Sequence, residues 1–553
     1  MARPDSPPAF APGALGLTRR RFLVVGAGAA ATLIGASCGV IATPVPSAPT
    51  AAASPPPPSP DPPGTPSATA SRAPTPRPSL PSLVSAPNRV ALENQLAGDG
   101  AWLLPFNNRG DVEGYFSQAS ASAGDQLQLY ARATGSRPCR KMDVALYRLG
   151  WYGGAGGRMV QRWKGVALES QPDPVMDPTT GLTRAPWSPA LTLTVPAEWT
   201  SGLYLAVMRP QDGEPRYATF VVREPAPAAP ILVLSAATNH QAYNHWGGKS
   251  LYTIRSNGAP TCAGDPRAVM VSFDRPYRDF RGAGLELRWE NNFVRWVEAQ
   301  RYNIAYAADS DLQRDPSITR GRRLIVFAGH PEYVSPAMRA TLEEAVAAGT
   351  NLAFFSGNEL YWRVRLEDGP TGPGRTVVCY RDPRIDPMVG VDSSRVTNQW
   401  REEPNARPES LLMGQMYGHV VEASADFVCS APSHWIYVGT GMRAGDAIPK
   451  LVGQEYDRYF PEPHLHPPGT EILAVSPVQP HFESVPSASE PWPAVANATI
   501  YTAPSGATVF SAGTMQWSWG LDGWNNPGWR GEPTPVDPRA QRITANVLDR
   551  LGS

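Results

Sequence analysis

The chain has 553 residues, enough for two or three domains. Its 49 basic and 49 acidic residues give a formal net charge of zero, so no bulk electrostatic attraction to nucleic acid or anionic lipid is expected. The 61 prolines are too many for one globular domain, and their uneven distribution indicates an extended segment beside the folded part.

The N-terminus has the features of an export signal. Residues 18–23 (TRRRFL) resemble the twin-arginine motif, and an apolar run continues to Ile34. This run is shorter than the ~20 residues that a permanent membrane span needs. Cys38 lies in IGASCG, which approximates a lipoprotein cleavage box; the alternative is simple cleavage nearby. We therefore predict a twin-arginine signal peptide at 1–38 and export to the cell envelope or extracellular face, with a membrane lipid anchor at Cys38 as one option.

A proline-rich spacer follows. Residues 44–87 contain 16 prolines, with mostly Ser, Thr and Ala between them. Such a composition cannot bury a core and favours an extended, semi-stiff chain. We assign residues 39–88 to a disordered linker and place no function in it.

Residues 89–225 lack helical periodicity and contain short alternating runs. Runs of this length, broken by Gly/Pro turns, predict a β-sandwich of the immunoglobulin type. The glycine cluster at 150–157 (GWYGGAGG) has no helical pattern after it, so we interpret it as a tight turn and not as a nucleotide-binding loop. The predicted strands are 126–133, 142–150, 191–196, 202–208 and 217–222.

Residues 226–553 have a different pattern. The continuous apolar run at 231–235 (ILVLS) is typical of a strand that is covered on both faces. Ser335 and Pro336 are suited to begin a helix between two further apolar runs, 324–328 and 351–356. Repeated β–α–β units predict a doubly wound, mainly parallel sheet with helices on both faces. Further strands are expected at 268–273, 302–307, 472–475 and 507–512, and a further helix carries the stripe Trp289, Phe293, Trp296 and Val297.

Polar side chains follow these strands. His330 and Glu332 come after 324–328, and Asn358 comes after 351–356. The run at 231–235 leads into NHQAYNHWGGKS, and 268–273 leads into DRPY. Because the carboxyl ends of parallel strands form the binding crevice of an open sheet, we expect these side chains to meet in one site.

Several long motifs make the chain similar to a known family. It resembles the catalytic, larger subunit of N,N-dimethylformamidase and its relatives from about Val90 to the C-terminus. The motifs that carry the resemblance are YRLGWYGG, NHQAYNHWGGKSLY, SFDRPY, AGHPEY, FFSGNELYWRVR and AGTMQWSWGLD.

The resemblance implies a glutamine-amidotransferase-like fold and one mononuclear ferric iron bound by two tyrosines and a glutamate. Carried over by motif, the iron ligands are Tyr243, Tyr277 and Glu332. His330 and Asn358 lie beside the metal, and Glu455, in GQEYDRY, is a further acidic group near it, on a weaker match. The characterised enzyme pairs this subunit with a small one, so a small subunit or a homo-oligomer is the expected partner.

The donor types agree with that implication. Phenolate and carboxylate are hard, anionic oxygen ligands that suit a trivalent ion. Iron with open coordination positions polarises an amide carbonyl and acidifies its bound water. His330 or Asn358 would orient the water or stabilise the oxyanion, and Glu455 would carry the proton to the leaving amine. The predicted activity is hydrolysis of the C–N bond of a small amide.

Competing sites are weaker. The single G-x-S-x-G match lies at 35–39, inside the export signal, so it is no nucleophile elbow. His464 and His466 lie in a proline-dense loop, which favours a solvated loop over a metal site. The alternative function is a surface-displayed protein that binds a carbohydrate or protein partner and carries a degenerate amidase-like domain, because Trp517, Trp519 and Trp524 could stack on sugars; we favour packing for them.

The cysteines outside the export signal are widely spaced and form no CxxC motif, which makes a zinc site improbable. In an oxidising compartment they could form disulfides, and buried free thiols are the alternative. These cysteines are Cys139, Cys262, Cys379 and Cys429.

Overall fold

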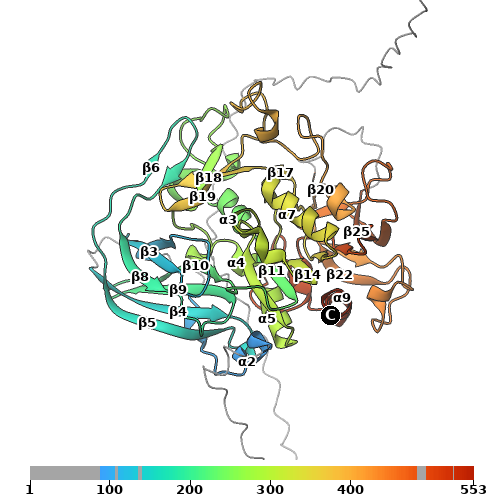
Figure 1. Ribbon diagram of the computed structural model, residues 1–553, viewed down its shortest axis with the longest axis horizontal. Coiled ribbons are helices and arrows are strands. Elements are labelled where there is room, and N and C mark those ends of the chain that lie inside the picture. Colours follow the sequence, from blue (N-terminus) through green and yellow to red (C-terminus); the bar gives the residue numbers. More distant parts are fainter. Residues whose placement is uncertain (1–86, 106–109, 135–139, 482–493, 527) are drawn as a thin grey trace, which may run out of the picture. The chain divides into compact units, whose positions relative to one another are not determined.

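The computed structural model describes residues 87–105, 110–134, 140–481, 494–526 and 528–553, which belong to one compact unit, Pro74–Ser553. It has a mixed α/β fold with several sheets (Figure 1). The predicted signal peptide, the spacer, Cys38 and Cys139 lie outside the described residues. Within the described ranges, helices are too short or too polar to cross a bilayer.

Two antiparallel-rich sheets form the first part of the described chain. One has the strand order β1-β3-β8 and the other the order β2-β10-β9-β4-β5, with β2 parallel to β10. Apolar side chains from both sheets form one buried cluster that includes Phe116, Leu129, Leu146, Met208 and Phe220. The strands are β1 Val112–Phe116, β2 Ser120–Ala121, β3 Gln126–Ala133, β4 Lys141–Leu149, β5 Gly157–Ala167, β8 Pro189–Thr194, β9 Gly202–Pro210 and β10 Arg216–Val222, with a small hairpin of β6 Val175–Met176 and β7 Thr183–Arg184.

A seven-stranded sheet organises the rest of the chain. Its order is β13-β11-β14-β16-β26-β25-β24; the first five strands are parallel and the last two are antiparallel. The mainly parallel sheet expected from the β–α–β pattern is therefore present. The strands are β11 Ile231–Ser235, β13 Ile304–Ala308, β14 Leu324–Phe327, β16 Asn351–Phe354, β24 Glu471–Pro477, β25 Val495–Thr502 and β26 Thr508–Ser511.

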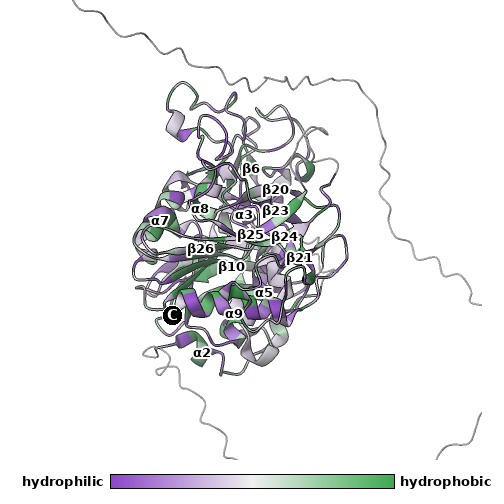
Figure 2. Cartoon of the chain, turned by 90° about the vertical axis from the view of Figure 1, so that its right-hand side faces the viewer, coloured by the Kyte–Doolittle hydropathy of each residue, from purple (hydrophilic) through white to green (hydrophobic). Residues whose placement is uncertain are grey.

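Both faces of this sheet are buried, which explains the continuous apolar run of β11. Ile231 and Val233 join a cluster with side chains of α5 and α9, whereas Leu232 and Leu234 join a second cluster with side chains of α7. Helix α9 has both hydrophilic and hydrophobic residues along its length (Figure 2), and its apolar side chains pack in the cluster of Ile231 and Val233. The helices are α2 Arg89–Glu93, α3 Ala237–Tyr243, α4 Glu286–Trp289, α5 Asn291–Ala299, α6 Asp311–Arg314, α7 Pro336–Ala347, α8 Ser410–Met413 and α9 Pro538–Gly552.

Helix α7 begins and packs as its sequence predicts. The Ser335 hydroxyl accepts a hydrogen bond from Met338 N, and Pro336 occupies the first turn. Met338, Leu342, Ala345 and Val346, which lie on one face of the helix, belong to one buried cluster. The stripe that begins at Trp289 is divided instead: Trp289 ends α4, and Phe293, Trp296 and Val297 lie on α5 in another cluster.

The expected strand at 268–273 does not enter the large sheet. Strand β12 (Met270–Ser272) pairs antiparallel with β19 (Gly372–Val378), which pairs with β18 (Arg365–Gly369). The chain after β12 is therefore directed by a separate small sheet. The remaining strands form two-stranded pairs: β15 Tyr333–Val334 with β17 Trp362–Arg363, β20 Met416–Val420 with β23 Glu455–Arg458, and β21 Ala425–Val428 with β22 Ala447–Val452.

A buried ion pair joins the first part of the chain to the second. Arg148 Nη2, on β4, lies 2.8 Å from Glu298 Oε1, on α5, and both side chains are fully buried. Tyr306 OH of β13 donates to the same carboxylate at 2.8 Å. Breaking such a pair leaves one buried charge uncompensated, so it favours a single packing of β4 against α5.

Candidate active site

The carboxyl ends of the central strands deliver the expected polar side chains. His330 and Glu332 lie between β14 and β15, and Asn358 follows β16. Helix α3 follows β11 and ends at Tyr243. All but Tyr243, which is half-buried, are almost fully buried, with at most 3 % of their surface exposed.

The Glu332 carboxylate is the centre of the cluster. Tyr243 OH donates to Glu332 Oε2 at 2.9 Å, and Tyr252 OH lies 2.9 Å from both Oε1 and Oε2. The two tyrosine rings stack with centroids 4.2 Å apart. Trp362 Nε1 donates to Oε1 at 3.0 Å. Two phenol oxygens and one carboxylate thus converge on one point.

Arg381 packs against the aromatic rings of this cluster. Its guanidinium lies over the ring of Tyr252 at 4.2 Å and over that of Trp362 at 4.7 Å. It also donates to the hydroxyl of Tyr333, which in turn donates to Tyr252 OH at 2.7 Å. Arg381 therefore supplies a positive charge near Glu332 without an ion pair to it, and it holds the Tyr252 and Trp362 rings by cation–π contact.

Tyr277, the second expected iron ligand, lies elsewhere. Its side chain borders a small cavity together with Gln241 and Glu286, and its hydroxyl is hydrogen-bonded to Gln241. Among the hydrogen bonds of the described residues, none joins it to Glu332. Strand β12, which precedes Tyr277, pairs in the small antiparallel sheet and not in the seven-stranded one. The structure places Tyr252 at Glu332 in its stead.

The sequence analysis did not predict Tyr252 as a site residue, although it is the last residue of NHQAYNHWGGKSLY, one of the motifs that carry the resemblance. Irregular chain separates it from Tyr243, so no periodicity relates the two side chains. A second tyrosine inside one motif was the available indication.

Asn358 and Glu455 form a direct pair. Asn358 Nδ2 donates to Glu455 Oε2 at 2.7 Å, and Asn358 N donates to Asp457 Oδ1 at 2.8 Å. Asn358 has φ of 57°, a left-handed conformation that asparagine tolerates better than most residues. Burial, followed by the charge of Glu332, raises the pKa of Glu455 to about 8. Strand β23 thus brings Glu455 near the Glu332 carboxylate.

His330 is held as a neutral imidazole beside the cluster. Its Nε2 lies 3.0 Å from Asn239 Nδ2, and its ring packs edge-on against Tyr243 and Trp289, with centroids 5.8 Å away in both cases. Burial, with the charges of His240 and Arg288, lowers the pKa of His330 to about 3. A neutral imidazole can donate one hydrogen bond and accept another.

The donor set fits a hard, highly charged cation. Burial, followed by the charge of Glu332, raises the pKa values of Tyr243 and Tyr252 well above the ordinary tyrosine value. Burial also raises the pKa of Glu332, although Arg381 opposes it. The three side chains therefore favour their protonated forms when no cation is bound. A trivalent cation could replace these protons, because phenolate and carboxylate are hard anionic ligands. Among the described residues, no group of three or more His, Cys, Asp or Glu side chains could hold a metal ion, so a metal at Glu332 depends on the tyrosines as ligands.

The competing candidates have ordinary structural contacts. His466 Nε2 lies 2.6 Å from Tyr459 OH, in the loop where a metal was the alternative. Trp517 and Trp519 are fully buried, and Trp524 packs on Trp102 with ring centroids 5.5 Å apart, so packing is their role here. Cys262, Cys379 and Cys429 are free thiols.

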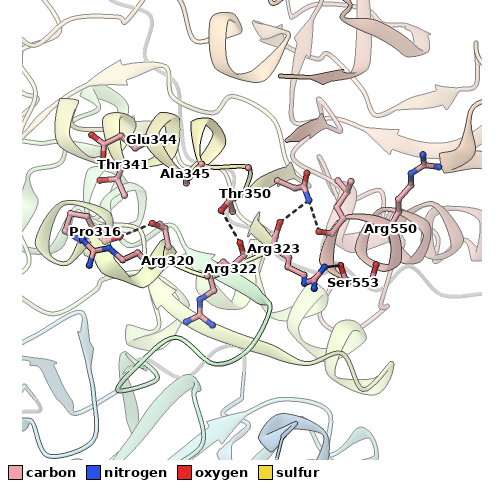
Figure 3. A pocket seen from close by; sticks show the side chains of 16 residues that line it. Pro316, Arg320, Arg322, Arg323, Thr341, Glu344, Ala345, Thr350, Arg550 and Ser553 are labelled. Carbon is pink, nitrogen blue, oxygen red and sulfur yellow. Dashed lines mark hydrogen bonds between the residues drawn. The ribbon is translucent and has the colours of Figure 1, made fainter. Parts of the chain in front are cut away.

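An open cavity of about 540 Å³ lies at the other, amino edge of the sheet (Figure 3). It borders the starts of β14 and β16 and the end of α7, and its lining includes Arg320, Arg323 and Arg550. None of the predicted site residues lines it. The carboxyl edge therefore remains the candidate active site.

Fold and site together define an α/β protein with carboxylate, phenol and imidazole groups gathered above the carboxyl edge of a parallel sheet. The family model described as N,N-dimethylformamidase beta subunit-like, C-terminal, matches residues 143–530. The chain belongs to this family, which confirms the resemblance and places the protein broadly among hydrolases. A comparison with curated proteins found no match.

Proposed function

We propose that the protein hydrolyses the C–N bond of a small amide with one ferric ion bound by Tyr243, Tyr252 and Glu332. The observation that carries this proposal is the convergence of two phenol oxygens on the Glu332 carboxylate at 2.9 Å. Tyr252 takes the position that the sequence had given to Tyr277. When bound, ferric iron would act as a Lewis acid toward the amide carbonyl and a water molecule.

The residues beside the cluster have separate tasks. Glu455 accepts the proton of the attacking water and transfers it to the nitrogen of the leaving amine, so that a carboxylic acid and an amine result. Asn358 orients Glu455 through its 2.7 Å hydrogen bond. His330, oriented by Asn239, donates a hydrogen bond to the carbonyl oxygen as negative charge develops on it.

The finer assignments of fold and location belong to the same proposal. The common core of the first two sheets supports an immunoglobulin-like sandwich at 89–225, and the mainly parallel sheet supports a doubly wound, glutamine-amidotransferase-like domain at 226–553. The twin-arginine motif supports export, with lipidation or cleavage at Cys38. A small subunit or a second copy of the chain is the proposed partner.

The test is an activity assay of the purified full-length protein after loading with ferric iron. Small formamides and acetamides are offered, and release of the carboxylate and amine is measured. We expect hydrolysis that a chelator abolishes and that Glu455→Gln reduces about 100-fold or more. An iron-loaded protein that cleaves none of these amides contradicts the proposal and favours the binding protein.

A further inference from the structure

Arg288 is a cation without an acidic partner beside the candidate active site. Its guanidinium stacks over the rings of Trp289 at 4.8 Å and Trp519 at 5.8 Å. Its hydrogen-bonding groups are poorly satisfied: Nη2 reaches Gln454 Oε1 only at 3.4 Å, and Nε is buried without a partner. No carboxylate of the described residues forms an ion pair with Arg288.

The position of Arg288 is tied to the catalytic groups through its neighbours. Trp289, on which the guanidinium lies, packs against the His330 ring. Gln454, its weak acceptor, directly precedes Glu455. Arg288 is also near enough to contribute, after burial and His240, to the lowered pKa of His330. Arg288 therefore lies beside the residues that flank His330 and Glu455.

The surroundings of Arg288 carry surplus positive charge. Arg255 lies 5.8 Å from the ring centroid of Tyr243 and forms a 2.6 Å ion pair with Asp279. Asp279 is thus occupied, and it also lies 3.8 Å from His245 Nδ1. Burial and repulsion by Arg255 lower the pKa of Arg288 to about 10, which Asp279 opposes only in part. A cation held in such a place is stabilised when an anion binds to it.

We infer that the substrate is an amide that carries a carboxylate, and that Arg288 binds this carboxylate while the amide group lies at Glu332. The inference rests on the proposed hydrolase function and names the substrate class of the same site. The Nη groups of a guanidinium match the two oxygens of a carboxylate in a bidentate pair, and the long 3.4 Å contact of Nη2 with Gln454 is weak enough to be replaced by one. The amide of Gln454 can support the same oxygen atoms from the side. Neutral amides lack the group that completes this contact.

A pair of matched ligands tests the inference. N-formylglycine has the carboxylate, and N-formylglycinamide replaces it by a neutral amide of nearly the same shape. Binding of each to the iron-loaded full-length protein is measured by calorimetry with Glu455→Gln, in which turnover is slow, and formate release is measured with the unmodified protein. We expect N-formylglycine to bind about 10-fold more tightly or better, since hydrogen bonds between charged groups are the strong ones.

Three variants assign the preference to Arg288. Arg288→Gln is expected to abolish the preference for N-formylglycine, and Arg288→Lys, which keeps the charge but not the fork, to retain part of it. Arg320→Gln removes an exposed arginine at the opposite edge of the sheet and serves as the charge-matched control, with the preference intact. Equal binding of the two ligands, absence of binding, or a preference that survives in Arg288→Gln overturns the inference. The proposed hydrolase function fails separately if the protein binds N-formylglycine but releases no formate.

Discussion

The two edges of the seven-stranded sheet are built from the same strands and have opposite chemistry. At the carboxyl edge, Glu332, His330 and Asn358 are almost fully buried. Each is hydrogen-bonded to another side chain of the site, at distances of 2.7–3.0 Å. At the amino edge, the cavity is open and its arginines Arg320 and Arg323 are exposed. Burial, and not the presence of charged residues, distinguishes the candidate active site. Substitutions at the two edges should therefore differ in their effects by orders of magnitude.

The largest effect is expected from Glu332→Gln. The amide has the shape of the carboxylate but not its charge, so it cannot balance a ferric ion together with two phenolates. Loss of an outer-shell partner alone weakens metal binding by about 10- to 100-fold, so loss of this ligand should exceed that. Iron content after dialysis and amide hydrolysis should both fall below detection. A variant that keeps one iron per chain would show that Glu332 is not the central ligand.

A second comparison separates the two tyrosines. Tyr252→Phe should remove a ligand, weaken iron binding by at least about 10-fold and change the visible absorption of the iron-loaded protein. Tyr277→Phe is the matched control: it removes a hydroxyl bonded to Gln241 and should leave iron content and absorption unchanged. The reverse result would restore the ligand set that the sequence suggested.

A smaller effect is expected from Asn358→Gly. Glycine accepts the left-handed conformation of this position, so the backbone is not strained, and only the side-chain hydrogen bond to Glu455 is lost. We expect kcat to fall by about 100-fold with little change in KM and iron content. Stopped assays at saturating amide and metal analysis check this. A change in KM alone would assign Asn358 to substrate binding.

The smallest effect is expected at the amino edge. Arg320→Gln should change the free energy of unfolding by no more than about 0.5 kcal/mol, because surface substitutions away from buried contacts rarely do more. Amide hydrolysis should be unaffected. Urea denaturation and the activity assay provide the two readouts. A large loss of activity would mean that the residues lining the cavity in Figure 3 influence amide hydrolysis at the carboxyl edge.

Much of the fold was predictable because periodicity and capping are local. The strand 231–235 and the helix begun by Ser335 are present as expected, and so are His330, Glu332 and Asn358 at the strand ends. The C-terminal helix α9 was missed, although Asp537 as N-cap and Pro538 in the first turn marked its start.

The ligand set was harder to predict because it depends on non-local pairing. The three residues of β12 are as apolar as a strand of the large sheet, but they pair with β19, about a hundred residues later in the chain. Tyr277, which follows β12, is hydrogen-bonded to Gln241 and not to Glu332. Glu455 came from the resemblance alone, since the chain between 361 and 468 has short strands joined by irregular segments. Tyr252 and Arg381 meet through stacking of side chains, which leaves no spacing pattern in the sequence.

The most direct test of the account is the metal content and visible spectrum of the purified full-length protein after exposure to ferric iron. The account predicts about one iron per chain and a broad visible band from charge transfer between tyrosinate and iron. A colourless protein that binds no iron under these conditions would contradict the assignment of Tyr243, Tyr252 and Glu332 as a metal site.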